Sequence, residues 1–99
     1  MPRYRIMVDS NFHYQEEDTR REGGIYATVE AAFAACHAIV DRSLREEYRP
    51  GISAEALYDR YTSFGDDPFI MVLDGADESA KFSAWSYAKE RSRIMCGER

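Results

Sequence analysis

The chain begins with an alternation of apolar and polar residues that predicts a β-strand. Every second position from residue 4 to residue 8 carries a large apolar side chain: Tyr4, Ile6 and Val8. A period of two is typical of a strand with one buried face. The polar, charged stretch 10–23 then predicts a long loop closed by the glycines 23–24, followed by a short second strand at 25–27.

The next segment has the period of an amphipathic helix over residues 29–47. Thr28 is expected to be its N-cap, and Glu30 favours the positive end of the helix. The apolar residues recur at steps of three and four: Val29, Ala32, Phe33, Cys36, Ile39, Val40 and Leu44. A second side carries only alanines: Ala31, Ala34, Ala35 and Ala38. This side reflects either the high helix propensity of alanine or the close approach of another helix or a partner.

The pair Pro50–Gly51 breaks the chain, and Ser53 is expected to cap a second helix. The apolar side of that helix is formed by Leu57, Tyr58, Tyr61 and Phe64. Gly65 predicts a left-handed cap at the end of the helix, and Asp66–Asp67–Pro68 predicts a turn.

A continuous apolar run, Phe69–Leu73, then predicts a strand in the middle of the sheet with both faces buried. A turn at 74–77 follows. Ser83 is expected to cap a last helix that ends near Met95, and the spacing of Phe82 and Tyr87 is that of a hydrophobic staple.

The expected order of elements is therefore β-β-α-α-β-α. The 99 residues, of which 44% are hydrophobic, suffice for one packed core. We predict a compact single α+β domain over residues 1–99, with a small, mainly antiparallel sheet of about three strands packed by helices.

Charge and composition exclude several classes of function. The net charge is −5, so no nucleic-acid partner is expected. No apolar run is long enough to span a membrane, and the N-terminus has no signal-peptide pattern, so we expect a cytoplasmic protein without a membrane partner. In that compartment Cys36 and Cys96 are expected to be reduced, with Cys36 buried as a small apolar side chain.

A candidate ligand site lies after the first strand, where an acid, an amide, an imidazole and aromatic rings come together within six residues. A second acidic segment, 66–67, could converge on it. The candidate ligand-binding residues are Asp9, Asn11, His13, Tyr14, Asp66 and Asp67. His13 could bind an anion or act as a general base beside a carboxylate. The alternative is a surface loop held by Phe12 and Tyr14, with turn hydrogen bonds from its polar side chains.

No metal site, cofactor or catalytic residue is expected. His37 and Cys36 are adjacent on a helix and point about 100° apart, so they do not readily bind one metal ion. The acidic segment 74–78 lacks the ligand spacing of a calcium-binding loop. No phosphate-binding glycine loop and no pattern of a nucleophile with its base is present.

The last helix offers candidate partner-binding residues, because its apolar side chains lie on more than one side: Trp85, Tyr87 and Ile94. The leading hypothesis is a small, non-enzymatic interaction domain that acts through self-association or a protein partner. The alternative is a small-molecule or metal-binding domain, which could also be catalytic, with its site at residues 9–14 and 66–67.

Overall fold

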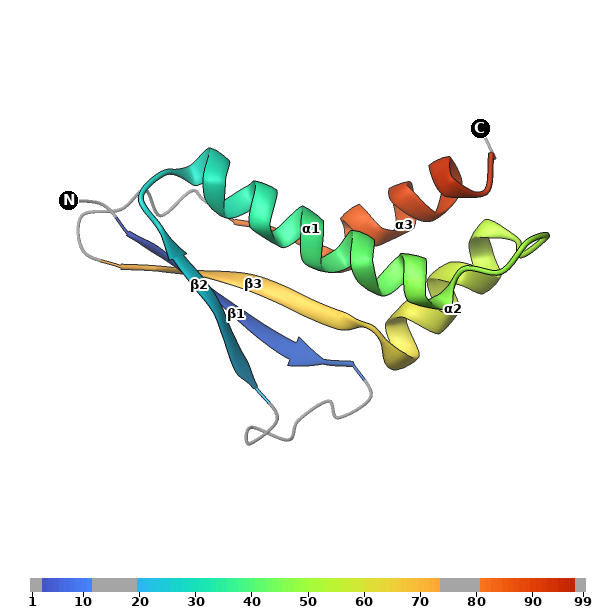
Figure 1. The fold of residues 1–99 in the computed structure, drawn as a ribbon, viewed down its shortest axis with the longest axis horizontal. Helices are drawn as coiled ribbons and strands as arrows, with labels where there is room; N and C mark the ends of the chain where they lie inside the picture. Colours follow the sequence, from blue (N-terminus) through green and yellow to red (C-terminus); the bar gives the residue numbers. More distant parts are fainter. Residues whose placement is uncertain (1–2, 12–19, 74–80, 98–99) are drawn as a thin grey trace.

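A computed structural model describes residues 3–11, 20–73 and 81–97. It contains a three-stranded antiparallel sheet and three helices in the predicted order (Figure 1). The elements are β1 (Tyr4–Ser10), β2 (Arg21–Tyr26), α1 (Val29–Glu47), α2 (Ala54–Phe64), β3 (Asp66–Val72) and α3 (Ala84–Met95). The predicted α+β class and the order β-β-α-α-β-α are confirmed.

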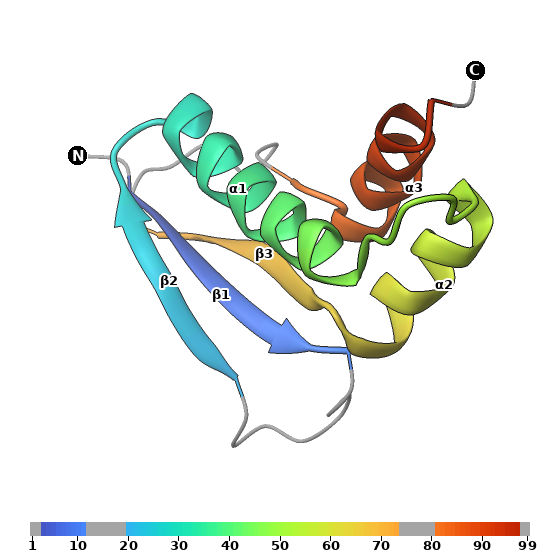
Figure 2. The same ribbon diagram turned by 45° about the vertical axis from the view of Figure 1, so that its right-hand side comes forward.

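The alternation at the N-terminus forms the centre of the sheet. The strand order is β2-β1-β3, and both neighbours run antiparallel to β1. Tyr4, Ile6 and Val8 point from β1 into the core and are almost fully buried. The three helices lie on this side of the sheet, with α2 and α3 beyond α1 (Figure 2).

The prediction of a central strand at Phe69–Leu73 is wrong. Residues 69–72 belong to β3, which pairs with β1 alone among the described strands, and Met71 is 42% exposed. Pro68 fits this edge position. Asn11 N–H donates to Gly65 O and Leu73 N–H donates to Arg3 O, so the alternation of the ladder turns the nitrogen of Pro68 away from β1. Proline occurs at such edge positions because it has no N–H to donate.

Two predicted loop boundaries are also wrong. β2 begins at Arg21, so the glycines 23–24 lie within the strand, at an irregularity in its pairing with β1, where Gly24 has φ +115°. Asp66–Asp67–Pro68 forms the start of β3 and not a turn. In both places the pairing of backbone groups across the sheet outweighs the turn preference of the local residues.

Gly65 ends α2, although not in the predicted left-handed conformation. Its backbone is extended, with φ −80° and ψ 177°. A Cβ atom at this position would lie 2.5 Å from Cδ1 of Tyr61 and 2.9 Å from Tyr61 O. Glycine is therefore required by the close approach of the chain to Tyr61.

The predicted caps are confirmed for all three helices. The hydroxyls of Thr28, Ser53 and Ser83 accept hydrogen bonds at 3.1, 3.1 and 3.3 Å from the N–H three residues further on. The Phe82 and Tyr87 rings lie 5.8 Å apart, so the predicted staple is also present. On the alanine side of α1, Ala34 and Ala38 are exposed, so no described helix covers those two positions.

The core consists of two clusters that α1 connects. One lies between α1 and the sheet and includes Ile6 and Cys36; the other lies between the helices and includes Leu44, Leu57 and Tyr61. Among the described residues, no helix is long and apolar enough to cross a membrane.

Candidate ligand pocket

A pocket of about 670 Å³ lies between β3, the end of β1, α2 and the start of α3. Its volume falls within the roughly 300–1,000 Å³ of small-molecule sites. The described residues that line this β3–α3 pocket are Asn11, Thr62, Asp67, Phe69, Phe82, Ser83, Ala84 and Trp85. Apolar side chains provide much of the lining, and Asp67 is its one ionisable side chain among the described residues.

Asn11 holds three elements together at the pocket. It follows β1 directly and is 8% exposed. Its Nδ2 donates to Tyr61 O at 3.0 Å, and its Oδ1 accepts from Trp85 Nε1 at 3.3 Å. One amide side chain thus connects β1, α2 and α3, and the two partners determine which end of the carboxamide carries the oxygen.

Asp67 is the chemically distinctive residue of the pocket. The pKa of its carboxyl is raised to about 6, first by burial and then by the negative charge of Asp9. Among the described residues, no basic side chain forms an ion pair with Asp67. A carboxyl with a raised pKa in a concave site is a recognised indicator of function.

The β1–β3 pairing explains why Asp67 and Asp9 influence each other. The two residues are directly opposite in the register, so their side chains leave the same face of the sheet. Arg20 neutralises Asp9, with Nε 2.6 Å from Oδ1 and Nη2 3.2 Å from Oδ2. The same guanidinium lies over the Phe69 ring, 5.1 Å from its centroid.

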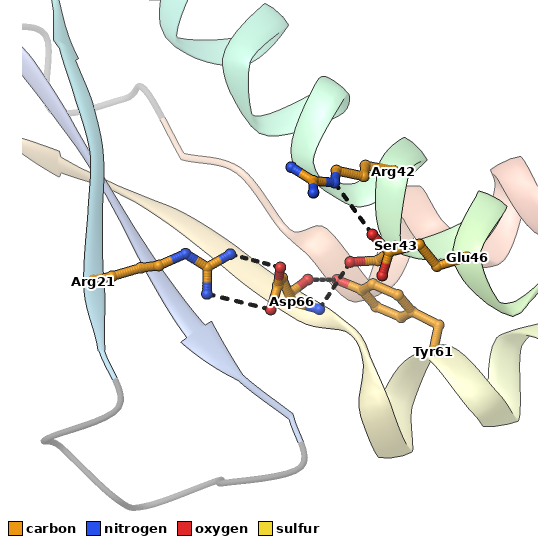
Figure 3. A network of polar contacts seen from close by, with 6 residues as sticks. All are labelled: Arg21, Arg42, Ser43, Glu46, Tyr61 and Asp66. Carbon is orange, nitrogen blue, oxygen red and sulfur yellow. Dashed lines mark hydrogen bonds and ion pairs between the residues drawn. The ribbon is translucent and has the colours of Figure 1, made fainter.

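Asp66 does not belong to the pocket. Neighbouring residues of a strand point to opposite faces, and Asp66 faces the helices (Figure 3). Its carboxylate binds Arg21 Nη2 at 2.6 Å. Its N–H donates to Ser43 Oγ at 3.0 Å, and its carbonyl oxygen accepts from the Tyr61 hydroxyl at 2.6 Å. Asp66 therefore joins β3 to β2, α1 and α2.

The structure brings part of the predicted ligand site together. Asn11 and Asp67 line the pocket, Asp9 lies beside Asp67, and Asp66 lies on the other face. His13, Tyr14 and Phe12 lie outside the described residues, as does the segment 74–78.

Sequence reasoning missed most of the aromatic lining. The sequence pattern predicts Phe69 in a buried central strand and Phe82 in a helix staple, and it gives no indication that Thr62 belongs to a site. The period of two in β3 could have indicated that Asp67 and Phe69 share a face. Nothing local to Phe82 or Ser83 indicates that the start of α3 lies beside β3.

The predicted partner-binding residues of α3 do not form one surface. Trp85 is 43% exposed at the pocket, and Ile94 is 55% exposed. Nine residues separate them, so they lie on opposite sides of the helix. Tyr87 faces α1 instead: its ring stacks on His37 at 4.2 Å between centroids, and its hydroxyl donates to Asp41 at 2.9 Å.

Cys36 packs in the core, and His37 packs against aromatic rings. Cys36 is fully buried, as predicted, and the pKa of its thiol is raised to about 12 by burial and then by the charge of Asp67. His37 contacts the Phe82 and Tyr87 rings. Within the described ranges, no group of three or more His, Cys, Asp or Glu side chains could hold a metal ion.

Comparison of the chain with protein-family models, curated proteins and solved structures finds no match in any of the three.

Proposed function

We propose that this protein binds a small organic molecule in the β3–α3 pocket. The observation that carries the proposal is a pocket of about 670 Å³ whose described lining includes one carboxyl, that of Asp67, with its pKa raised to about 6. Sites for small molecules combine an apolar lining with few polar groups that fix orientation. The aromatic side chains Phe69, Phe82 and Trp85 provide the apolar part, and Asp67 provides the polar group.

The other polar side chains among the described lining residues already form hydrogen bonds within the protein, which makes Asp67 the main described anchor for a ligand. The Thr62 hydroxyl donates to Asp59 O at 3.0 Å, and the Ser83 hydroxyl donates to Ser86 Oγ at 3.0 Å. The Asn11 amide binds Tyr61 and Trp85. These contacts fix the walls of the pocket before a ligand enters, which lowers the entropic cost of binding.

A fragment screen followed by protein NMR tests this function. The chain has one tryptophan, so its single indole N–H resonance reports on the pocket. We expect binding fragments to shift this resonance and the amides of Asp67 and Phe69. Ile94→Ala, on the opposite side of α3, should leave binding unchanged. Fragments that bind only elsewhere, or none that bind, would contradict the proposal.

A protein-interaction domain is the second candidate, favoured by the face of the sheet that the helices leave uncovered. Ile25 and Met71 flank Arg5 on this face and are 44% and 42% exposed. Exposed apolar side chains in neighbouring register positions are typical of contact surfaces. If this face mediates self-association, sedimentation should detect a dimer that Ile25→Asp and Met71→Asp abolish.

We also propose a cytoplasmic location. The two cysteines support it, because no disulfide joins Cys36 and Cys96, and Cys36 is fully buried. Cysteines that stay reduced are typical of a reducing compartment. Localisation of the tagged protein in its native cell tests this directly.

A further inference from the structure

We propose that the ligand of the β3–α3 pocket is an organic cation, a protonated amine or guanidinium joined to an apolar body, with its positive group at Asp67. This inference rests on the proposed function and names the chemical class that the pocket accepts. It depends on the charge of the lining, on the placement of the aromatic rings and on a contact that the protein itself makes beside the pocket.

The charges around the pocket favour a cation. Asp67 is the one ionisable side chain among its described lining residues, and Asp9 lies opposite Asp67 across the β1–β3 pair. The guanidinium of Arg20, which lies over the lining residue Phe69, is bound to Asp9. An anionic ligand would meet the Asp67 carboxylate, and none of the described lining residues is cationic, whereas an ammonium group would donate a charge-assisted hydrogen bond to Asp67.

The aromatic lining favours the same class. Phe69, Phe82 and Trp85 all contribute to the pocket. The negative face of an aromatic ring attracts ammonium and guanidinium groups, and the ring also covers the apolar part of such a ligand. A metal ion is a poor alternative, because no described group of three ligating side chains is present and aromatic carbon does not coordinate hard cations.

Arg20 makes within the protein the same kind of contact that we propose for the ligand: a cationic group bound to a carboxylate beside an aromatic ring. Its guanidinium binds the Asp9 carboxylate at 2.6 Å while lying 5.1 Å from the centroid of the Phe69 ring. Asp67 and Phe69 share this face of the sheet with Asp9. The carboxylate of Asp67, beside the same Phe69 ring, is thus left for the positive group of a ligand.

The ionisation of Asp67 makes the proposed binding depend on pH. The groups that interact with this carboxyl come from three elements: Asp9 from β1, Tyr61 from α2 and Cys36 from α1. Burial and Asp9 raise the pKa of Asp67 to about 6, whereas a bound cation would lower it. Affinity for a cation should therefore fall about tenfold between pH 7.5 and pH 5, and binding near pH 6 should release protons.

Three probes with the same ring and different charge test the class: 2-phenylethylammonium, 2-phenylethanol and 3-phenylpropanoate. Titrations followed by the Trp85 indole and Asp67 amide resonances give the dissociation constants. We expect the ammonium probe to bind about tenfold more tightly than the other two probes at pH 7.5, or more tightly still. This is the gain in affinity that one hydrogen bond to a charged group provides. A blocked Phe–Lys dipeptide presents the same groups from a peptide. Binding of either the free amine or the dipeptide supports the cation class. The one that binds more tightly indicates whether the natural ligand is a free amine or a peptide.

Two variants complete the test. Asp67→Asn should weaken binding of the ammonium probe about tenfold and remove its pH dependence. Asp59→Asn removes the same charge from an exposed position outside the pocket and should change neither. If the alcohol or the carboxylate binds as well as the amine, or if Asp67→Asn has no effect, the cation assignment is wrong while the pocket remains a binding site. If no probe and no screened fragment binds there, the proposed function fails as well.

Discussion

Trp85 and Asn11, 74 residues apart in the sequence, are joined by a hydrogen bond of 3.3 Å from the indole Nε1 to the amide Oδ1. The same amide donates to Tyr61 O in the buried part of the molecule. The bond fixes the first turn of α3 against the end of β1 and shapes one wall of the pocket. The contacts of Asn11 therefore link stability to the shape of the candidate site.

Replacement of Asn11 by alanine should destabilise the fold by about 1–3 kcal/mol, because it removes two hydrogen bonds, one to Tyr61 O and one from Trp85 Nε1. Trp85→Phe keeps a ring but loses one partly exposed hydrogen bond, and should cost about 0.5–1.5 kcal/mol. Urea unfolding followed by circular dichroism measures both. If both variants lose the same free energy of unfolding, the Asn11–Tyr61 hydrogen bond does not contribute to stability.

The raised pKa of Asp67 should make the free energy of unfolding depend on pH. Its folded pKa of about 6 lies above the unfolded value of about 3.9, so the folded state holds this proton more tightly. The resulting stabilisation is complete below about pH 3.9 and is lost as the pH rises through 6. Relative to Asp67→Asn, the wild type should lose about 1–2 kcal/mol of unfolding free energy between pH 4 and pH 7.

The matched control for that measurement is Asp59→Asn, which removes an exposed carboxyl from α2. Its stability should follow that of the wild type at every pH. Parallel curves for the wild type and Asp67→Asn would mean that Asp67 titrates normally, and one support of the ligand proposal would be lost.

Gly65→Ala should destabilise the protein by about 1–3 kcal/mol. The added Cβ would lie 2.5 Å from Tyr61 Cδ1 and 2.9 Å from its carbonyl oxygen, so the ring or the backbone must move. Ser63→Ala, at an exposed position of the same helix, should stay within about 0.5 kcal/mol of the wild type. Thermal unfolding of the pair distinguishes a steric cost from a general effect on α2.

The thiols should react with a thiol-specific chromogenic reagent in two distinct phases. Cys96 is partly exposed, whereas Cys36 is fully buried with its pKa raised to about 12. At pH 8 without reductant, we expect the native protein to react quickly at Cys96 and the second thiol to appear on unfolding. A Cys36→Ser variant should lose the slow phase only. Two equally fast thiols would contradict the burial of Cys36.

Local patterns in the sequence were sufficient to predict the helices. The threonine or serine before each apolar segment marks where the helix begins, and α1 has the predicted bounds of 29 and 47. Caps and periodicity act over one or two turns, so they can be read from neighbouring residues. The buried alternation of Tyr4, Ile6 and Val8 was predictable for the same reason.

The position of β3 in the sheet was decided by tertiary structure. The apolar run Phe69–Leu73 has the composition of a central strand, yet β1 takes the centre and β3 the edge. The apolar composition of a strand indicates that its side chains are packed against other elements. It does not indicate whether a neighbouring strand or a helix lies beside it. Pro68 is the local sign of an edge strand, but proline is equally typical of a turn, so the sequence alone does not distinguish the two.

The candidate site was also decided by tertiary structure. Asp66 and Asp67 are neighbours in sequence, but pairing of β3 with β1 turns them to opposite faces, so one joins Arg21 and the other lines the pocket. Asn11 and Trp85 meet only because α3 packs beside the end of β1. The sequence by itself determined where each helix begins and which side of β1 is buried, since these depend on residues a few positions apart. Which carboxyl lines the pocket depends on long-range pairing, which no local pattern encodes.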